Sequence, residues 1–461
     1  MFGVLIEAAP QDWQILQQKE GMATITASGR YVLPPESDIT QPVVYLRMVR
    51  EDNGMPVVDW QPAKLLAGET WEGELTVPAG GLYRLETCLA QQGNPVLEWA
   101  TRGDMRHHLG VGDLYVIAGQ SNSAGYGKDP FYDPPELGVH LCRNSMRWDL
   151  ATHPMNESTD MAHPANLEGC NPGASPYLAF GKLLRRELGY PIGLLQTSLG
   201  GSPLSQWNPE EDGRLYRSMM EVIASQGGSV RGVLWYQGCS DVGEEESRTY
   251  GERFARVVRA FREEMGEDTP WLTVQLNRRL RQEEVSDEDA GWGRVREAQR
   301  QAARNLPGIS IVPAIDCGLS DGIHNSAAAN VVLGERLAGA ALRDIYHRPW
   351  SCGAPDLKAV RHTSPDTLEL TFAPVVGRLF DIDSYDVRCR AFTVEDADGK
   401  EIAVTNAELT KDTITLHLAQ SVSGPCRVSA GWQMEPPVRL PLDFATHQPI
   451  LSFYQVEAEE A

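Results

Sequence analysis

Residues 112–125, with the sequence GDLYVIAGQSNSAG, decide the fold of this chain. The apolar run 114–118 predicts a fully buried strand. This run ends at a glycine and leads directly into a Gln-Ser-Asn turn, where Ser121 can present its hydroxyl to a cleft. Ser121 is therefore a candidate nucleophile, although a serine after a strand is also a common helix N-cap.

A candidate partner for Ser121 lies far downstream, in the stretch 321–324 (DGIH). Serine is a weak nucleophile at its own pKa and needs an adjacent base, a role that imidazole suits. A carboxylate nearby can orient the imidazole and stabilise its charged form. His324 and Asp321 can supply these two groups. The alternative is that Asp321 caps the following helix and His324 is a surface residue.

Two further segments reach glycine-containing turns after apolar runs, namely 196–207 (QTSLGGSPLSQW) and 232–241 (GVLWYQGCSD). Adjacent glycines let a backbone N–H approach a reacting oxygen closely. Acyl transfer needs such donors, or a side-chain amide, around a developing oxyanion. Each glycine pair alone is more often a simple turn. Four such segments at the ends of expected strands favour a catalytic site.

Together these motifs resemble the SGNH-type hydrolases, and within them the group of sialate O-acetylesterases and carbohydrate acetylesterases. The resemblance covers roughly residues 112–342. The stretches that carry it are 118–122 (AGQSN), 198–207 (SLGGSPLSQW), 235–238 (WYQG), 274–276 (VQL), 295–299 (VREAQ) and 321–324 (DGIH).

The resemblance implies a role for each motif residue. Ser121 is the nucleophile, His324 the general base and Asp321 the residue that orients His324. The oxyanion hole is implied to consist of the Ser121 N–H, the N–H of Gly200 or Gly201 (Gly200 being favoured) and the Gln237 amide. Expected substrate contacts are Gln120, Asn122, Trp207, Arg296 and Gln299.

The chain departs from the family pattern at three positions. Cys239 stands where the family commonly has Glu, so a second carboxylate that could support the histidine is missing. Asn325 replaces a frequent Pro, and Ser123 replaces a frequent Met. None of these changes removes a core catalytic group, so they bear on substrate choice more than on reaction type.

The chain is strongly acidic, with 41 Lys and Arg against 63 Asp and Glu and a net charge of -22. This charge argues against binding to nucleic acid or to an anionic membrane surface. An anionic substrate such as a sialic acid would have to be met by local cations. The nearest candidates in the sequence are four arginines: Arg278, Arg279, Arg294 and Arg296. The alternative is that each is a solvated charge on a helix or loop.

The sequence predicts three parts. Residues 1–105 alternate apolar and polar positions and predict a β-rich, sandwich-like domain. Residues 106–346 alternate strands and helices and predict a three-layer α/β/α hydrolase domain with a parallel sheet. Residues 347–461 predict a second β-rich, sandwich-like domain, either a scaffold or a carbohydrate-binding module.

Strands of the parallel sheet are expected near 114–118, 192–196, 232–236, 271–276 and 309–314. The helix that follows the first strand is expected to have Ser175 as its N-cap and Gly189 at its C-terminal end. Because ligands bind at the carboxyl ends of parallel strands, the motif segments are expected to meet at one edge of the sheet.

No metal or cofactor is expected, because the eight cysteines form no Cys-x-x-Cys pair and the proposed chemistry needs neither. The first residues lack a basic segment and no long apolar run occurs, so a cytoplasmic location is expected. Self-association into a homo-oligomer stays open.

The sequence thus predicts a serine esterase that removes acetyl groups from a carbohydrate, with O-acetylated sialic acid as the leading substrate. Acetylxylan or another plant glycan is the alternative substrate. A non-catalytic carbohydrate-binding protein on the same scaffold is the alternative of a different class.

Overall fold

A computed structural model describes residues 2–93, 97, 100–266, 268–282, 288–350, 353–383, 387–422 and 424–459. The central part is a parallel sheet in the order β11-β10-β12-β9-β13-β14-β15, in which only β11 runs antiparallel to its neighbour. Its strands are β9 (Thr101–Gly119), β10 (Val139–Cys142), β11 (Trp148–Leu150), β12 (Ile192–Gln196), β13 (Gly232–Tyr236), β14 (Trp271–Gln275) and β15 (Ile309–Pro313).

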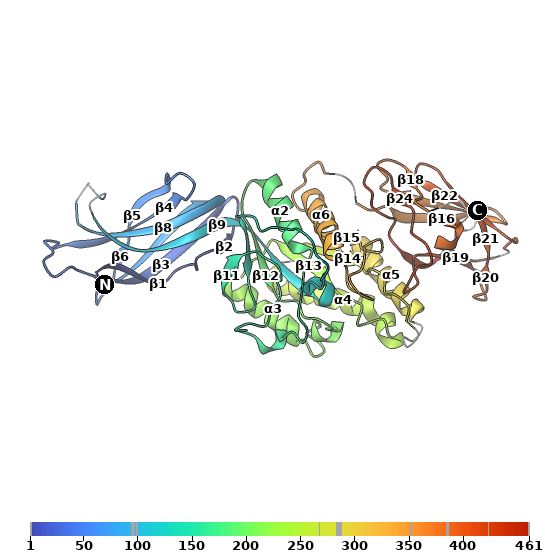
Figure 1. Ribbon diagram of the computed structural model, residues 1–461, viewed down its shortest axis with the longest axis horizontal. Helices are drawn as coiled ribbons and strands as arrows, with labels where there is room; N and C mark the ends of the chain where they lie inside the picture. Colours follow the sequence, from blue (N-terminus) through green and yellow to red (C-terminus); the bar gives the residue numbers. More distant parts are fainter. Residues whose placement is uncertain are drawn as a thin grey trace.

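Helices cover both faces of this sheet (Figure 1). One face carries α2 and α6, which pack against each other, and the other carries α3, α4 and α5. Alternating strands and helices in the sequence produce this arrangement, as expected for an α/β fold. The helices are α1 (Ser121–Ala124), α2 (Tyr177–Leu188), α3 (Arg214–Ser225), α4 (Glu244–Met265), α5 (Asp289–Asn305) and α6 (Ala327–Asp344).

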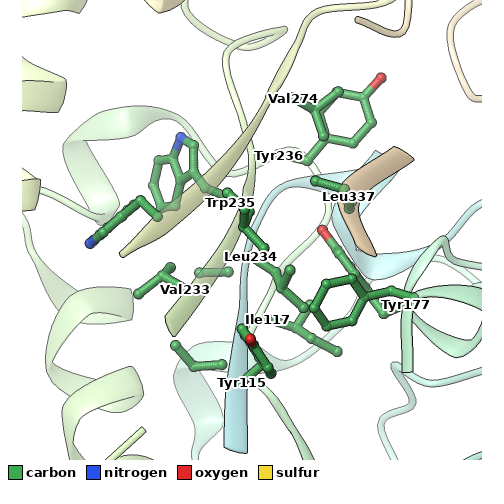
Figure 2. Close-up of a cluster of buried hydrophobic side chains, with 14 of the residues drawn as sticks. Tyr115, Ile117, Tyr177, Val233, Leu234, Trp235, Tyr236, Val274 and Leu337 are labelled. Atoms are coloured by element: carbon green, nitrogen blue, oxygen red, sulfur yellow. The ribbon is translucent and has the colours of Figure 1, made fainter. Parts of the chain in front are cut away.

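Strand side chains alternate between the two helical layers. On β13, Trp235 packs against Phe254 of α4, with ring centroids 5.6 Å apart. On β9, Tyr115 packs against Phe180 of α2 at 4.9 Å. Figure 2 shows Trp235 on one side of the strands and Tyr177 on the other. Because both faces are covered, the strands read as nearly continuous apolar runs.

The N-terminal part consists of β-strands that join the central sheet through β9. The first half of β9 pairs with β8, and its second half lies between β12 and β13. The expected boundary at residue 105 therefore falls inside one strand. The other strands are β1 (Gly3–Ala8), β2 (Ile15–Gln17), β3 (Met22–Val32), β4 (Pro42–Arg50), β5 (Pro56–Pro62), β6 (Lys64–Leu65), β7 (Thr70–Pro78) and β8 (Gly80–Gln91).

The C-terminal part contains two four-stranded sheets, β16-β17-β22-β21 and β20-β19-β23-β25, and a two-stranded ribbon of β18 and β24. Its buried apolar side chains form a cluster separate from that of the central sheet. The strands are β16 (Asp356–Ser364), β17 (Thr367–Ala373), β18 (Leu379–Phe380), β19 (Phe392–Glu395), β20 (Glu401–Ile402), β21 (Val404–Leu409), β22 (Thr413–Leu418), β23 (Arg427–Ala430), β24 (Leu442–Asp443) and β25 (Phe453–Glu457).

Two local expectations meet different outcomes in α2. Gly189 adopts a left-handed conformation and ends the helix, as expected. The N-cap position is Pro176, not Ser175, whose hydroxyl donates to the Met155 sulfur instead. The Ser175 prediction is wrong because Pro176 takes the N-cap position and the Ser175 oxygen accepts no backbone N–H of the helix.

Within the described ranges, no helix combines the length and apolar character needed to cross a membrane. Six of the cysteines that the structure describes are free thiols, namely Cys88, Cys142, Cys170, Cys239, Cys317 and Cys426, and Cys352 lies outside the described residues.

Candidate active site

Ser121 lies on the sharp turn that follows β9. Gly119 ends the strand at a φ of +124°, and a Cβ atom there would lie 2.3 Å from the Tyr236 carbonyl oxygen of β13. Only glycine permits this approach. The turn is fixed further by the Ser123 hydroxyl, which bonds the Ala118 carbonyl and the Tyr177 hydroxyl. Ser121 thereby sits at the carboxyl edge of the sheet, where it is 8% exposed.

The three residues expected to act together form a chain of two hydrogen-bonding contacts with His324 in the middle. Ser121 Oγ lies 2.9 Å from His324 Nε2, and His324 Nδ1 lies 2.7 Å from Asp321 Oδ2. The second oxygen of Asp321 accepts the backbone N–H groups of Ile323 and His324. Chemically, this chain can pass the serine proton to the imidazole and stabilise the resulting imidazolium.

The surroundings of Asp321 keep it ionised. Partial burial acts to raise its pKa, but the hydrogen bond from His324 and the two backbone N–H groups outweigh burial and lower the pKa below its ordinary value. A carboxylate in this state fixes the imidazole tautomer with a proton on Nδ1, so that Nε2 can accept the serine proton.

Asn122 holds the loop that carries His324. Its Oδ1 accepts the Asn325 N–H at 2.9 Å, and its Nδ2 donates to the Ile323 carbonyl at 3.3 Å. Asn277 supports the same loop by donating to the Ile323 carbonyl and to Asn325 Oδ1, both at 2.8 Å. Asn122 is 1% exposed. In this structure its amide therefore positions the loop of His324, and its expected substrate contact stays a prediction.

Gln120 is likewise committed to the protein. Its Oε1 accepts the N–H groups of Gly238 and Ser240, and its Nε2 donates to the Ser240 hydroxyl. It is 3% exposed. It therefore ties the nucleophile turn to the segment that follows β13, and its expected substrate contact stays a prediction.

The expected oxyanion donors differ in their availability. The Gly200 N–H donates to Glu168 Oε2 at 2.9 Å. Both hydrogens of the buried Gln237 amide are used, by Asp241 and by the Ser202 carbonyl. In this structure neither group is free for an oxyanion. By contrast, the N–H groups of Ser121 and Gly201 donate to no acceptor among the described residues.

Trp207 and Gln299 are fully buried and do not line an open site. Trp207 packs edge-on against Trp235 and donates to the Ser202 hydroxyl at 3.0 Å. Gln299 bridges Leu276 and Gln237 through its amide. In this structure both side chains are committed to the protein interior, Trp207 after a 3-10 turn and Gln299 within α5, so neither is placed to contact a sugar.

Arg296 is also buried, and its guanidinium joins two parts of the chain. It donates to the carbonyls of Leu276 and Asn277 on one side and to the carbonyls of residues 431–433 on the other. Burial lowers its pKa to about 9. Arg296 therefore cannot meet a substrate carboxylate, which corrects the expectation.

The other three arginines differ. Arg279 lies 3.5 Å from Glu288, and Arg294 lies 2.7 Å from Glu244, so both are ion-paired. Arg278 is half-buried and makes no ion pair with the residues that the structure describes.

The structure adds two residues that the sequence did not single out. The Tyr126 ring packs on the His324 imidazole, with centroids 4.7 Å apart, and its hydroxyl donates to Glu168 at 2.7 Å. Burial and the Glu168 carboxylate both raise the pKa of Tyr126, so the hydroxyl stays a donor. Tyr126 stands between two glycines just after the nucleophile motif, and this position could have predicted it as a residue of the site. Glu168 lies in a polar loop, where no feature of the sequence distinguishes it as a site residue.

Cys239 is half-buried, and burial raises the pKa of its thiol to about 12. It therefore remains a neutral thiol where the family pattern has a carboxylate. Among the described residues, no group of three or more His, Cys, Asp or Glu side chains is arranged to hold a metal ion.

A Ser-His-Asp hydrogen-bond chain at the carboxyl edge of a parallel α/β sheet is typical of serine hydrolases. A family model described as carbohydrate esterase, sialic acid-specific acetylesterase, matches residues 111–343, slightly more than half of the chain. The chain belongs to this family of carbohydrate esterases.

Individual relatives agree with this assignment. The chain is 27% identical over 274 residues to a probable carbohydrate esterase from Arabidopsis thaliana, covering 54% of this chain and 98% of that protein. It is 24% identical over 194 residues to the human sialate O-acetylesterase, covering 34% of this chain and 36% of that enzyme. A solved carbohydrate acetylesterase from Xanthomonas citri has a similar fold, with a TM-score of 0.65, 21% identity and coverage of 97% of this chain and 98% of its own.

Proposed function

We propose that this protein is a serine esterase that removes O-acetyl groups from a carbohydrate, with O-acetylated sialic acid as its substrate. The observation that carries the proposal is the continuous hydrogen-bond chain from Ser121 through His324 to Asp321. Membership of the acetylesterase family supports the reaction, and the family description supports the acidic sugar.

In the proposed mechanism, Ser121 Oγ attacks the acetyl carbonyl carbon while His324 Nε2 takes its proton. The negative charge that develops on the carbonyl oxygen is met by the N–H groups of Ser121 and Gly201, which have no acceptor in the described structure. The C–O bond to the sugar then breaks, and His324 returns the proton to the departing sugar oxygen. Water attacks the acetyl-enzyme in the same way and releases acetate.

The Gly200 N–H can contribute to this oxyanion hole only after Glu168 leaves it. A carboxylate already accepting that N–H would repel a second negative oxygen at the same place. The donors that are free in this structure to meet the oxyanion are therefore the N–H groups of Ser121 and Gly201. The Gly200 N–H becomes a third donor only when Glu168 has moved away.

A neutral plant glycan is the second candidate substrate. One observation favours it: of the four arginines expected to meet a sugar carboxylate, two are ion-paired and Arg296 is buried. The Arabidopsis relative, aligned over 98% of its length, carries only the broad name of a carbohydrate esterase. A non-catalytic binding protein would have no need for the connected trio.

The deciding experiment measures acetate release from O-acetylated sialic acid and from acetylated xylo-oligosaccharides side by side. Ser121→Ala and His324→Ala serve as test variants, and Ser225→Ala, a serine at the distant end of α3, serves as the control. Loss of a general base costs about 10²–10⁴ in rate, so His324→Ala should fall at least that far. Release from the xylo-oligosaccharides alone would correct the substrate. Release from neither, or full activity in Ser121→Ala, would refute the esterase.

A further inference from the structure

A lysine stands on the same group of loops as the candidate nucleophile. Lys128 is exposed, but its backbone is held firmly. Its N–H donates to the Ser320 hydroxyl at 3.0 Å, one residue before Asp321. The preceding Gly127 exchanges two backbone hydrogen bonds with Ala174, and Asp129 Oδ1 accepts the Ala327 N–H at the start of α6. The position of Lys128 relative to the His324 loop is therefore fixed by the fold.

The side chain of Lys128 extends toward this site. Its Cγ lies beside Gly173, where a Cβ atom would be 3.4 Å away. Its ammonium lies over the Tyr126 ring, 5.4 Å from the centroid, and the same ring packs on His324 at 4.7 Å. The Tyr126 ring thus lies between the Lys128 ammonium and the His324 imidazole.

Lys128 differs from most cations of this acidic chain, because it forms no ion pair with a carboxylate of the described residues. Arg279 and Arg294, expected from the sequence to meet an anionic substrate, each have a carboxylate partner. The intervening ring is also chemically appropriate. A cation in direct contact with His324 would disfavour the imidazolium that forms during attack, whereas the Tyr126 face attracts the ammonium.

We propose that Lys128 binds the carboxylate of an acidic acetylated sugar and so makes the protein prefer anionic substrates over neutral ones. This inference rests on the proposed function, since it names the group that selects among acetylated sugars. Arg278, which also makes no ion pair with the residues that the structure describes, is the alternative binding partner for the same carboxylate.

The test compares N-acetylneuraminic acid with its methyl ester, in which one added methyl group removes the charge of the carboxylate. Binding of each is measured by calorimetry in the Ser121→Ala background, which cannot cleave the ester through Ser121. With Lys128 present, the acid should bind about fivefold more tightly than the methyl ester, the scale of one exposed ion pair. Lys128→Gln should bind both equally, while Lys128→Arg should keep the preference. The preference should weaken at high salt.

The control variants are Lys400→Gln, which makes the same charge change in the C-terminal part, and Arg278→Gln. The inference is overturned if Lys128→Gln keeps the preference, if Arg278→Gln removes it instead, or if neither ligand binds. Hydrolysis of 4-nitrophenyl acetate by the unaltered protein tests the esterase separately. Without hydrolysis the proposed function fails, and the binding comparison still decides whether Lys128 recognises the acid.

Discussion

Replacing Asn122 with alanine tests whether the buried amide positions His324 or contacts the substrate. The substitution removes the one acceptor that the described structure gives to the Asn325 N–H, and this residue is buried. The Ile323 carbonyl keeps its bond from Asn277. One orphaned buried N–H costs about 1–3 kcal/mol, so Asn122→Ala should lower the free energy of unfolding by that amount.

The effect on catalysis follows from the same geometry. Asn122 bonds the residues on either side of His324, so its loss releases the imidazole from its 2.9 Å contact with Ser121. A misplacement of about 1 Å in a catalytic group can cost ~10²-fold in rate. We expect kcat to fall while KM changes little, because the Asn122 amide is committed to the loop that carries His324.

The assay is acetate release from O-acetylated sialic acid, combined with urea unfolding of the same variants. Asn305→Ala, at the exposed end of α5, is the matched control and should change neither quantity. An increase in KM with an unchanged kcat would refute this reasoning and restore Asn122 as a substrate contact. A wild-type stability would show that the Asn325 N–H finds another acceptor.

Three further predictions concern other parts of the structure. Arg296→Met should lower the free energy of unfolding by about 3 kcal/mol or more, measured in urea, because buried carbonyls on both sides lose their donor. Asp321→Asn should lower the free energy of unfolding at neutral pH. Because the native pKa of Asp321 is depressed, the difference between variant and wild type should be present above the ordinary pKa of Asp and disappear as the pH falls through the native pKa. A difference that does not depend on pH would contradict this assignment. The exposed Cys170 thiol lies beside Tyr126, so iodoacetamide should slow acetate release, and Cys170→Ser should remove that sensitivity; inhibition that persists in the variant would place the reactive thiol elsewhere.

The central strands were predictable because burial on both faces leaves an unmistakable apolar run. The ranges 192–196 and 232–236 match β12 and β13, and the expected 271–276 and 309–314 differ from β14 and β15 by one residue. By contrast, β10 and β11 were not predicted. They are only four and three residues long, and His140 and Asp149 interrupt their apolar character.

The candidate site was predictable to a different extent for different residue types. Ser121, His324 and Asp321 could be proposed together because few arrangements other than catalysis need that combination. The roles of the residues around them could not be predicted from the sequence. A buried amide or guanidinium that supports a loop is the same residue type as one that binds a sugar. Gln120, Asn122 and Arg296 all proved to serve backbone groups of the protein itself. Domain limits and catalytic roles stay predictions.

The 19 residues of β9 have a consequence for how this protein can be divided. The same strand is an edge-to-edge partner of β8 at one end and the support of the nucleophile turn at the other. A cut near residue 105 would therefore sever a hydrogen-bonded ladder rather than a linker. The N-terminal strands are thus bonded to the same strand that leads into Ser121, and another module could not be joined at residue 105 without breaking the β8–β9 pairing. The first hundred residues and the nucleophile turn are therefore connected through one continuous β-strand.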